Sequence, residues 1–302
     1  MEQVTVRVPA TSANIGPGFD SLGLALSLYC EIGFSRLDAG ALEIRGCDNK
    51  YANDQNLAYV AFKKVYEKAG VPLPGIRLDI KSDIPVSRGL GSSAAMIVAG
   101  VCAANAMLEY CLSAEELLAV ATRLEGHPDN VAPALLGGFT ASLLDHGAPK
   151  CVSLEISEKF KFCALIPDFE TQTHEARRLL PVEVDFADAV FNVSHTAVLI
   201  GALARGDVGL VRASLEDRLH QPYRKSMIAG FEEVKAAAQN AGAAAFFISG
   251  AGPTCMCLLE SDGEYARRMS EALQGLKHKW SAVLLDIDRA GARIVGGGCL
   301  EK

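Results

Sequence analysis

The chain contains 302 residues, half of them hydrophobic, and carries a formal net charge of −7. This composition can fill the core of one large or two ordinary domains, and the acidic balance excludes nonspecific nucleic-acid binding, which depends on clustered Lys and Arg. Nine cysteines without a CxxC pair predict reduced thiols in a cytoplasmic protein and argue against a zinc-finger site.

The first predicted element is a strand that ends in a polar loop. Val4, Val6 and Val8 alternate with polar residues, a pattern typical of a half-buried strand and unlike a basic, apolar export signal. In the loop that follows, PATSANIGPGFD, Asn14 offers a donor and an acceptor, and Asp20 suits an ammonium group. We expect a ligand here, with turn formation and capping as the plain alternative.

Three strands and one helix are predicted next. The strands are expected at 22–34, 42–44 and 76–80. The helix is expected to run from Ala58 to a stop at Gly70, with Asn53 or Asp54 as its N-cap. The first part of the chain therefore mixes α and β structure.

The most informative segment is the run from Pro85 to Ala95, PVSRGLGSSAA. Gly89 and Gly91 allow the backbone to approach an anion, while Ser92 and Ser93 supply hydroxyls at the start of an apolar run. The free N–H groups and the dipole at a helix start favour bound phosphate without any cationic side chain. The segment therefore predicts a nucleotide phosphate loop, with an ordinary glycine-rich turn as the alternative.

The helix predicted after this loop covers 94–108 and is interrupted by Asn105. It falls short of the roughly 20 residues that span a bilayer, so we expect a buried helix and no membrane association. The lysine of the GxxxxGK[ST] loop is absent, which excludes the common P-loop class. Whether Lys81 or Arg88 replaces that lysine, or is simply solvated, stays open.

A helix is predicted to begin at a capping box of Ser113 and Glu116 and to end near Arg123. A cluster of polar residues then precedes a short predicted helix that opens at Pro128. The segment EGHPDN places two carboxylates, an imidazole and an amide within six residues. Glu125 is a hard oxygen ligand suited to Mg²⁺, with Ser93 as its hydroxyl partner, although Ser92 is not excluded from that role. The alternative is that the acidic and amide residues only occupy the first turn, where the helix dipole favours them.

The second half of the chain predicts a further set of strands and helices. A strand is expected at 139–144, before this set. Within the set, strands are expected at 162–167, 244–248, 255–259 and 282–287, and helices at 187–205, 208–218, 226–241 and 263–276. Their order suggests a small antiparallel α+β unit that follows a polar, glycine- and proline-containing stretch at 145–150. Arg177 and Arg224 lie in polar segments, and arginine binds carboxylates through paired hydrogen bonds. A surface arginine is commonly solvated, so either residue alone is ambiguous.

Together these segments resemble the GHMP kinase superfamily and, within it, the homoserine kinases. The resemblance covers essentially the whole chain and rests on five motifs that follow the family order, PATSANIGPGFD, EGHPDNVAPALLGG, EAR, EDRLHQPYR and SGAGPT, besides the phosphate loop. Mevalonate and sugar kinases would not share all five. The resemblance implies phosphorylation of the side-chain hydroxyl of L-homoserine by ATP, giving O-phospho-L-homoserine on the route to threonine.

The family pattern also implies roles for individual residues. It assigns the amino-acid pocket to Asn14, Asp20, His127, Asn130, Arg177 and Arg224. It assigns the nucleotide to Asn56, Pro85, Val86, Ser87, Arg88, Gly89, Leu90, Gly91, Ser92, Ser93, Ala94 and Ala95, and Mg²⁺ to Ser93 and Glu125. Asp20 would oppose the α-ammonium group, and the two arginines the α-carboxylate. Asn14, His127 or Asn130 would orient polar atoms, the hydroxyl among them.

One departure from the wider superfamily bears on mechanism. Mevalonate-type kinases have an aspartate where this chain has Asn130, so the usual general base is missing. Asp129 is adjacent, but one step along a helix turns a residue about 100° away. We therefore predict catalysis mainly by alignment, by Asn130, Ser93 and Glu125, and by charge neutralisation, with the hydroxyl proton passing to the γ-phosphate.

The resemblance implies a two-domain α+β fold. Residues 1–155 would form a ribosomal protein S5 domain 2-like, ATP-binding domain, and residues 156–302 a ferredoxin-like domain, with the active site between them. It also implies a homodimer, whose surface the sequence does not show. Two alternatives stay open: a kinase of the same fold for another small alcohol, and a sensor that binds ligand without turnover.

Overall fold

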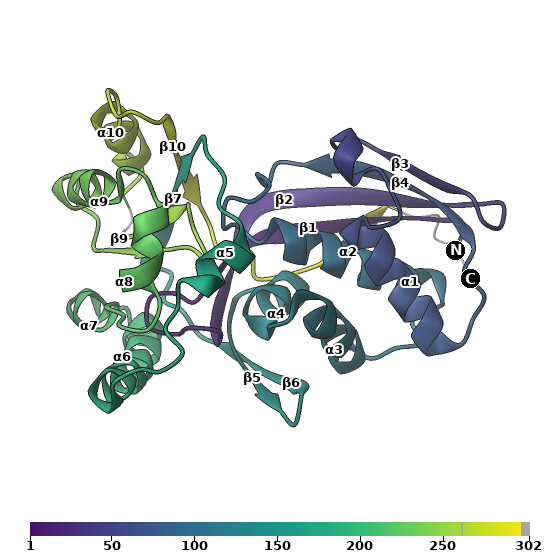
Figure 1. The fold of residues 1–302 in the computed structure, drawn as a ribbon, viewed down its shortest axis with the longest axis horizontal. Coiled ribbons are helices and arrows are strands. Elements are labelled where there is room, and N and C mark those ends of the chain that lie inside the picture. Colours follow the sequence, from purple (N-terminus) through teal and green to yellow (C-terminus); the bar gives the residue numbers. More distant parts are fainter. Residues whose placement is uncertain (261, 297–302) are drawn as a thin grey trace.

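The computed structural model describes residues 1–260 and 262–296, which form two sheets, each packed against helices (Figure 1). Within these residues the first sheet has the strand order β11-β1-β2-β4-β3, with β5 beside β2 and β6 beside β5. The strands are β1 (Gln3–Ala13), β2 (Leu22–Leu37), β3 (Leu42–Arg45), β4 (Gly75–Ser82), β5 (Phe139–Asp145), β6 (Ala148–Leu154) and β11 (Arg293–Gly296). Only β3 and β4 pair in parallel among them.

Four helices pack against this first sheet and bury its apolar face (Figure 1). They are α1 (Leu57–Ala69), α2 (Ser92–Met107), α3 (Ala114–Glu125) and α4 (Pro128–Leu136). The predicted capping box of Ser113 and Glu116 is confirmed at the start of α3. The predicted N-cap of α1 is wrong: Asn56 accepts a hydrogen bond from the Ala58 N–H at 3.0 Å, while Asn53 shapes the turn before it.

The second sheet is antiparallel and has the order β10-β7-β9-β8. Its strands are β7 (Phe160–Pro167), β8 (Ala245–Ile248), β9 (Cys255–Glu260) and β10 (Trp280–Leu285). The accompanying helices are α5 (Thr173–Arg178), α6 (Phe186–Arg205), α7 (Val208–Ser214), α8 (Gln221–Arg224), α9 (Phe231–Asn240) and α10 (Tyr265–Ala272). Short 3₁₀ turns cover Asn49–Tyr51 and Lys225–Met227.

Two helices beside the second sheet, α7 and α9, are shorter at one end than the sequence predicted. The helix expected over 208–218 ends at Ser214, because the Asp217 carboxylate accepts the backbone N–H groups of residues 219–221 and turns the chain. The helix expected over 226–241 begins at Phe231, after Gly230 adopts a left-handed conformation with φ +77°. Both departures follow from local side-chain or glycine geometry that interrupts an otherwise helical pattern.

The chain returns to the first sheet after it has built the second. The Ser27 N–H donates to the Asp286 carbonyl at 2.9 Å, and β11 pairs with β1. The expected division after residue 155 falls between β6 and β7 and stays a prediction. The first sheet therefore combines both ends of the described chain.

Candidate functional site

The predicted phosphate loop leads directly into α2, as the sequence suggested. Gly91 is the N-cap at φ +70°, and among the described residues no side chain caps this helix, so the first-turn N–H groups face outward without a protein side-chain acceptor. A Cβ on Gly89 or Gly91 would collide with Ser249, Gly252 or Thr11. Only glycine therefore allows the loop to pack this closely, which keeps a helix N-terminus open for an anion.

The Arg88 side chain turns away from the phosphate loop toward the second sheet. Its guanidinium donates to the carbonyls of Val86, Pro167 and Asp168 at 2.9 to 3.1 Å and forms an ion pair with Glu170 at 3.2 Å. Because protein acceptors engage all three of its nitrogens, Arg88 ties the loop to the end of β7.

Two cavities meet at the phosphate loop. The larger, about 640 Å³, has many apolar lining residues, including Leu57, Ile80, Ile84, Val86 and Met96. The smaller, about 120 Å³, is lined by polar residues, including Asn14, Asp20, Glu125, His127, Asp129, Asn130, Arg177 and Arg224. Ser87, Ser92 and Ser93 line both. The two cavities are therefore adjoining compartments that share one wall at the start of α2.

Asn56 borders the larger cavity, but its amide has a structural role. Its Nδ2 donates to the Tyr51 carbonyl at 2.9 Å, and its Oδ1 accepts the Ala58 N–H as the α1 cap. Asn56 therefore shapes the wall of this cavity by fixing the turn before α1.

Ser93 and Glu125 meet beside the shared wall. The Ser93 hydroxyl donates to the Glu125 carboxylate at 2.6 Å. Burial raises the pKa of Glu125, while the Ser93 hydrogen bond and the nearby His127 oppose that rise. A hydroxyl and an enclosed carboxylate are hard oxygen donors of the kind that Mg²⁺ prefers, so this pair fits the predicted metal site.

The charged residues of the small cavity are paired with one another where a substrate was expected to bind them. Arg177 forms two hydrogen bonds to Asp20, at 2.8 and 3.0 Å. Asn14 accepts the Asp20 N–H at 3.0 Å and donates to the Gly250 carbonyl at 2.9 Å, so its amide holds the loop. Arg224 differs from these residues: it is buried, and its Nε has no partner among the described residues.

The residues that open α4 also face the small cavity. Asn130 accepts the Thr11 hydroxyl at 2.7 Å, and Asp129 is buried against the His127 ring. Burial lowers the pKa of His127, but its hydrogen bond to Asp129 and the nearby carboxylates raise it above its ordinary value overall. The expectation that Asp129 turns away is wrong: the cavity wraps around the helix start, so consecutive residues both line it.

His220 contributes to the site through Arg224, although the sequence analysis assigned it no role. It is fully buried, its Nε2 lies 2.8 Å from the Gly16 carbonyl, and its Nδ1 lies 3.4 Å from Nη1 of Arg224. Since a carbonyl only accepts, Nε2 carries the proton and Nδ1 is an acceptor. The sequence contains one signal of this contact. In HQPYR the histidine and the arginine are four residues apart, which is about one helical turn and makes their side chains neighbours.

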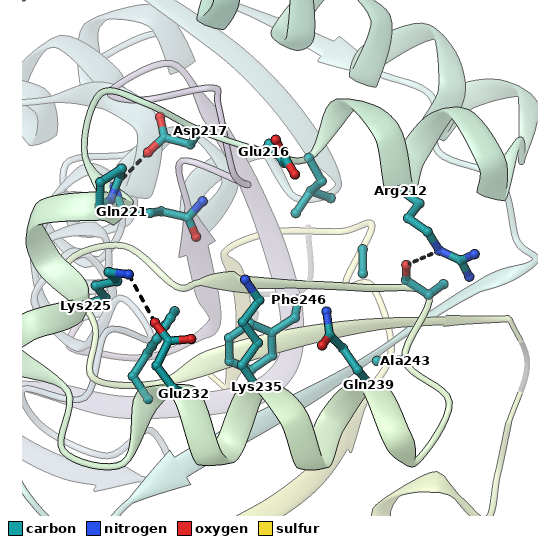
Figure 2. A pocket seen from close by; sticks show the side chains of 15 residues that line it. Arg212, Glu216, Asp217, Gln221, Lys225, Glu232, Lys235, Gln239, Ala243 and Phe246 are labelled. Carbon is teal, nitrogen blue, oxygen red and sulfur yellow. Dashed lines mark hydrogen bonds and ion pairs between the residues drawn. The ribbon is translucent and has the colours of Figure 1, made fainter. Parts of the chain in front are cut away.

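A further cavity of about 600 Å³ lies beside α8 and is lined by Asp217, Gln221 and Lys235, among others (Figure 2). None of the predicted site residues lines it. In Figure 2, Asp217 accepts the Gln221 N–H at the start of α8, the helix that carries Arg224. Most of the predicted site residues instead line the two adjoining cavities at the phosphate loop.

Comparison with known proteins assigns the chain to a family. The model of the GHMP kinases N terminal domain matches residues 56–138, and that of the GHMP kinases C terminal matches residues 199–277. A homoserine kinase of Clostridium botulinum is 46% identical over 289 residues, covering 95% of this chain and 97% of that protein. The chain belongs to the homoserine kinase family. A homoserine kinase of Clostridium beijerinckii is 44% identical over 97% of this chain and 99% of that protein.

Solved structures agree with this family. The crystal structure of homoserine kinase from Cytophaga hutchinsonii covers 98% of both chains, with a TM-score of 0.89 and 29% identity. A mevalonate diphosphate decarboxylase from Staphylococcus aureus also covers 98% of both chains, with a TM-score of 0.72 but only 14% identity, and shares the fold alone. The predicted two-domain GHMP kinase fold is therefore confirmed.

Proposed function

We propose that this protein transfers the γ-phosphoryl group of ATP to the side-chain hydroxyl of L-homoserine, giving O-phospho-L-homoserine in the synthesis of threonine. The single observation that carries the proposal is the pair of adjoining cavities. The larger suits an adenosine, the smaller suits a short amino acid, and the start of α2 between them suits the phosphates.

The small cavity carries charges that complement a zwitterion. Asp20 would receive the α-ammonium group, and Arg177 the α-carboxylate, so that the substrate replaces the ion pair these residues now make. That exchange costs little, since a half-exposed ion pair contributes about 0 to 1 kcal/mol. Arg224 would supply its unpaired, buried Nε to the same carboxylate.

Catalysis would depend on alignment and charge neutralisation. The substrate oxygen attacks the γ-phosphorus, the bond to the bridging oxygen breaks, ADP leaves, and the hydroxyl proton passes to a γ-phosphate oxygen. Asn130, held by Thr11, would orient the hydroxyl. Asp129 is engaged by His127, which supports a mechanism without a carboxylate base.

Mg²⁺ is the metal that the Ser93 and Glu125 donor set fits. When bound, it would neutralise negative charge on the phosphate oxygens.

We also propose a cytoplasmic homodimer. The eight cysteines that the structure describes are free, as in a reducing compartment.

A coupled assay of ADP release with Mg²⁺ and ATP tests the function. L-homoserine should support turnover, while L-serine, L-threonine, mevalonate and galactose should support much less. Turnover with mevalonate or galactose instead would overturn the substrate assignment. ATP binding without turnover on any of these alcohols would overturn the kinase.

Asp129→Asn tests the role of that carboxylate in the same assay. We expect a modest loss of rate, because the reaction is proposed to need no carboxylate base. A loss of several thousandfold in kcat with unchanged homoserine binding would show that Asp129 acts as the base. Isothermal titration with homoserine measures the binding separately from the rate.

A further inference from the structure

Helix α6 is apolar on two faces, only one of which is covered. Its inner face packs into the core through Leu199, Ala202 and Leu203, and Asn192 on that face binds the Pro17 carbonyl at 3.1 Å. The helix has 20 residues, most of them apolar, yet few of them are buried. A helix normally exposes a polar face to solvent, so an exposed apolar face of this length indicates a surface that another molecule covers.

The outer face is a continuous stripe without charge. Its exposed members, spaced three or four residues apart, are Phe186, Val190, Val193, Ala197, Gly201 and Ala204. Phe186 is 85% exposed, Val193 72% and Val190 51%, which are large values for such side chains. In Figure 1, α6 lies at the rim of the molecule, on the side away from α1 and α3.

The stripe has a direction, with large side chains toward its start and small ones toward its end. A second α6 laid antiparallel across it, centred near residue 195, would place Phe186 against Ala204 and Val193 against Ala197. Each large residue would then meet a small one, and a Cβ added at Gly201 meets no atom within 4 Å, which leaves room for close approach.

The charges at the two ends of α6 fit the same arrangement. Asp185, just before the helix, and Arg205, its last residue, are both exposed and form no ion pair with any residue that the structure describes. The antiparallel arrangement brings Asp185 of each copy to Arg205 of the other, twice, as a twofold axis requires.

From these observations we infer that α6 is an isologous interface, in which two copies of this chain pair antiparallel through the stripe from Phe186 to Ala204. The inner face of the same helix holds the Pro17 carbonyl and the segment around Asp217, so the dimer would brace the walls of the substrate cavity from behind. The inference goes beyond the kinase activity and does not depend on it.

Val193→Glu is the decisive variant. It places an unpaired carboxylate in the centre of an apolar interface, which should weaken dimerisation about a hundredfold or more. Light scattering coupled to size exclusion should give twice the 32.0 kDa chain mass for the parent and the single mass for the variant. Val152→Glu on β6, where the valine is 56% exposed, is the matched control and should remain dimeric.

A charge exchange tests the antiparallel direction separately. Arg205→Asp should weaken the dimer several-fold by placing like charges together at both ends. The double variant with Asp185→Arg and Arg205→Asp should restore it. Sedimentation at several concentrations measures both dissociation constants.

Four results would overturn the inference. A parent protein with the mass of a single chain would show that no dimer forms. A Val193→Glu variant that kept the mass of two chains would show that the dimer forms through another surface. Failure of the double variant to recover, with its circular dichroism intact, would exclude the antiparallel pairing. Flotation of the parent with phosphatidylcholine vesicles, abolished by Val193→Glu, would assign the stripe to a lipid surface instead.

Discussion

His220 and Arg224 show how one buried residue can set the chemistry of another. The imidazole stacks on Phe19 with the ring centroids 5.1 Å apart, and the guanidinium lies over the same ring. With its Nε2 proton committed to Gly16, the imidazole offers Arg224 an acceptor and no charge. The ring therefore orients the arginine without competing for the substrate carboxylate.

We predict that His220→Phe raises the KM for homoserine about tenfold and leaves kcat nearly unchanged, because it keeps the ring stack and removes the acceptor. His220→Gln, which retains a donor and an acceptor, should stay closer to the parent. Steady-state kinetics with Arg224→Ala as background measure the coupling. If His220→Phe raised the KM by the same factor with and without Arg224→Ala, His220 would not act by orienting Arg224.

A second prediction at this scale concerns acid stability. Burial lowers the pKa of His220 from its ordinary value near 6.5, with Arg224 adding to the effect and Asp217 opposing it. The unfolded chain therefore takes up a proton that the folded chain does not. The free energy of unfolding should fall as the pH drops from about 7 toward the lowered pKa of His220, by up to about 1.4 kcal/mol per pH unit.

Urea unfolding at several pH values measures that slope. The comparison is with His220→Gln, which has no group titrating at that position and keeps the other histidines. The parent should lose more stability than the variant between pH 7 and mildly acidic conditions. Equal slopes for the two proteins would mean that His220 is protonated in the folded state.

The helices differ in what their first residues do. Ser113 caps α3 on an exposed surface, whereas Asn56 caps α1 and also lines the larger cavity. The start of α2 has no side-chain cap among the described residues, and that is the helix the phosphate loop leads into. The start of α3 is therefore only structural, whereas the starts of α1 and α2 also border a cavity.

We predict that Ser113→Ala and Asn56→Ala each lower the free energy of unfolding by about 1 kcal/mol, because each removes one N-cap. Only Asn56→Ala should also raise the KM for ATP, since it loosens the turn that walls the larger cavity. Thermal unfolding and ATP titration of both variants check this. If the KM for ATP changed equally in Ser113→Ala and Asn56→Ala, the nucleotide would not bind in the larger cavity.

The sequence predicted individual strands and helices better than it predicted the contacts between them. Alternating valines indicated β1, and the capping box indicated the start of α3, because both signals are local. The end of α7 depends on Asp217, and the partners of Asp20 and Arg88 come from residues distant in sequence. Periodicity describes one element at a time, so these long-range contacts were beyond it.

Arg88 acts at the scale of the whole molecule. It lies in the phosphate loop of the first unit and binds carbonyls at the end of β7 in the second. The Thr171 N–H also donates to the Ser87 carbonyl at 3.2 Å, so the segment before α5 is held to the same loop. The two units therefore meet directly at the shared wall of the cavities.

We predict that Arg88→Ala lowers the affinity for ATP about threefold to tenfold, because the loop loses the two hydrogen bonds and the ion pair that fix it to the second unit. Hydrogen exchange over residues 85–95 should become faster, while exchange in α3 should not change. Lys81 is exposed on β4 and lines neither of the two adjoining cavities, so Lys81→Ala is the control. Unchanged exchange in the loop of Arg88→Ala would mean that the glycine turns alone hold it.

The pairing of β1 with β11 has an engineering consequence. Thr5 lies opposite Gly296, so the two ends of the described chain are neighbours in one sheet. A short peptide could join them, and a new start could be cut at the exposed turn between β5 and β6, where Asp145 faces Ala148. Such a circular permutant would keep every strand in its present order within both sheets, so the order in which the ribosome makes the two units could be reversed while the finished enzyme stays the same.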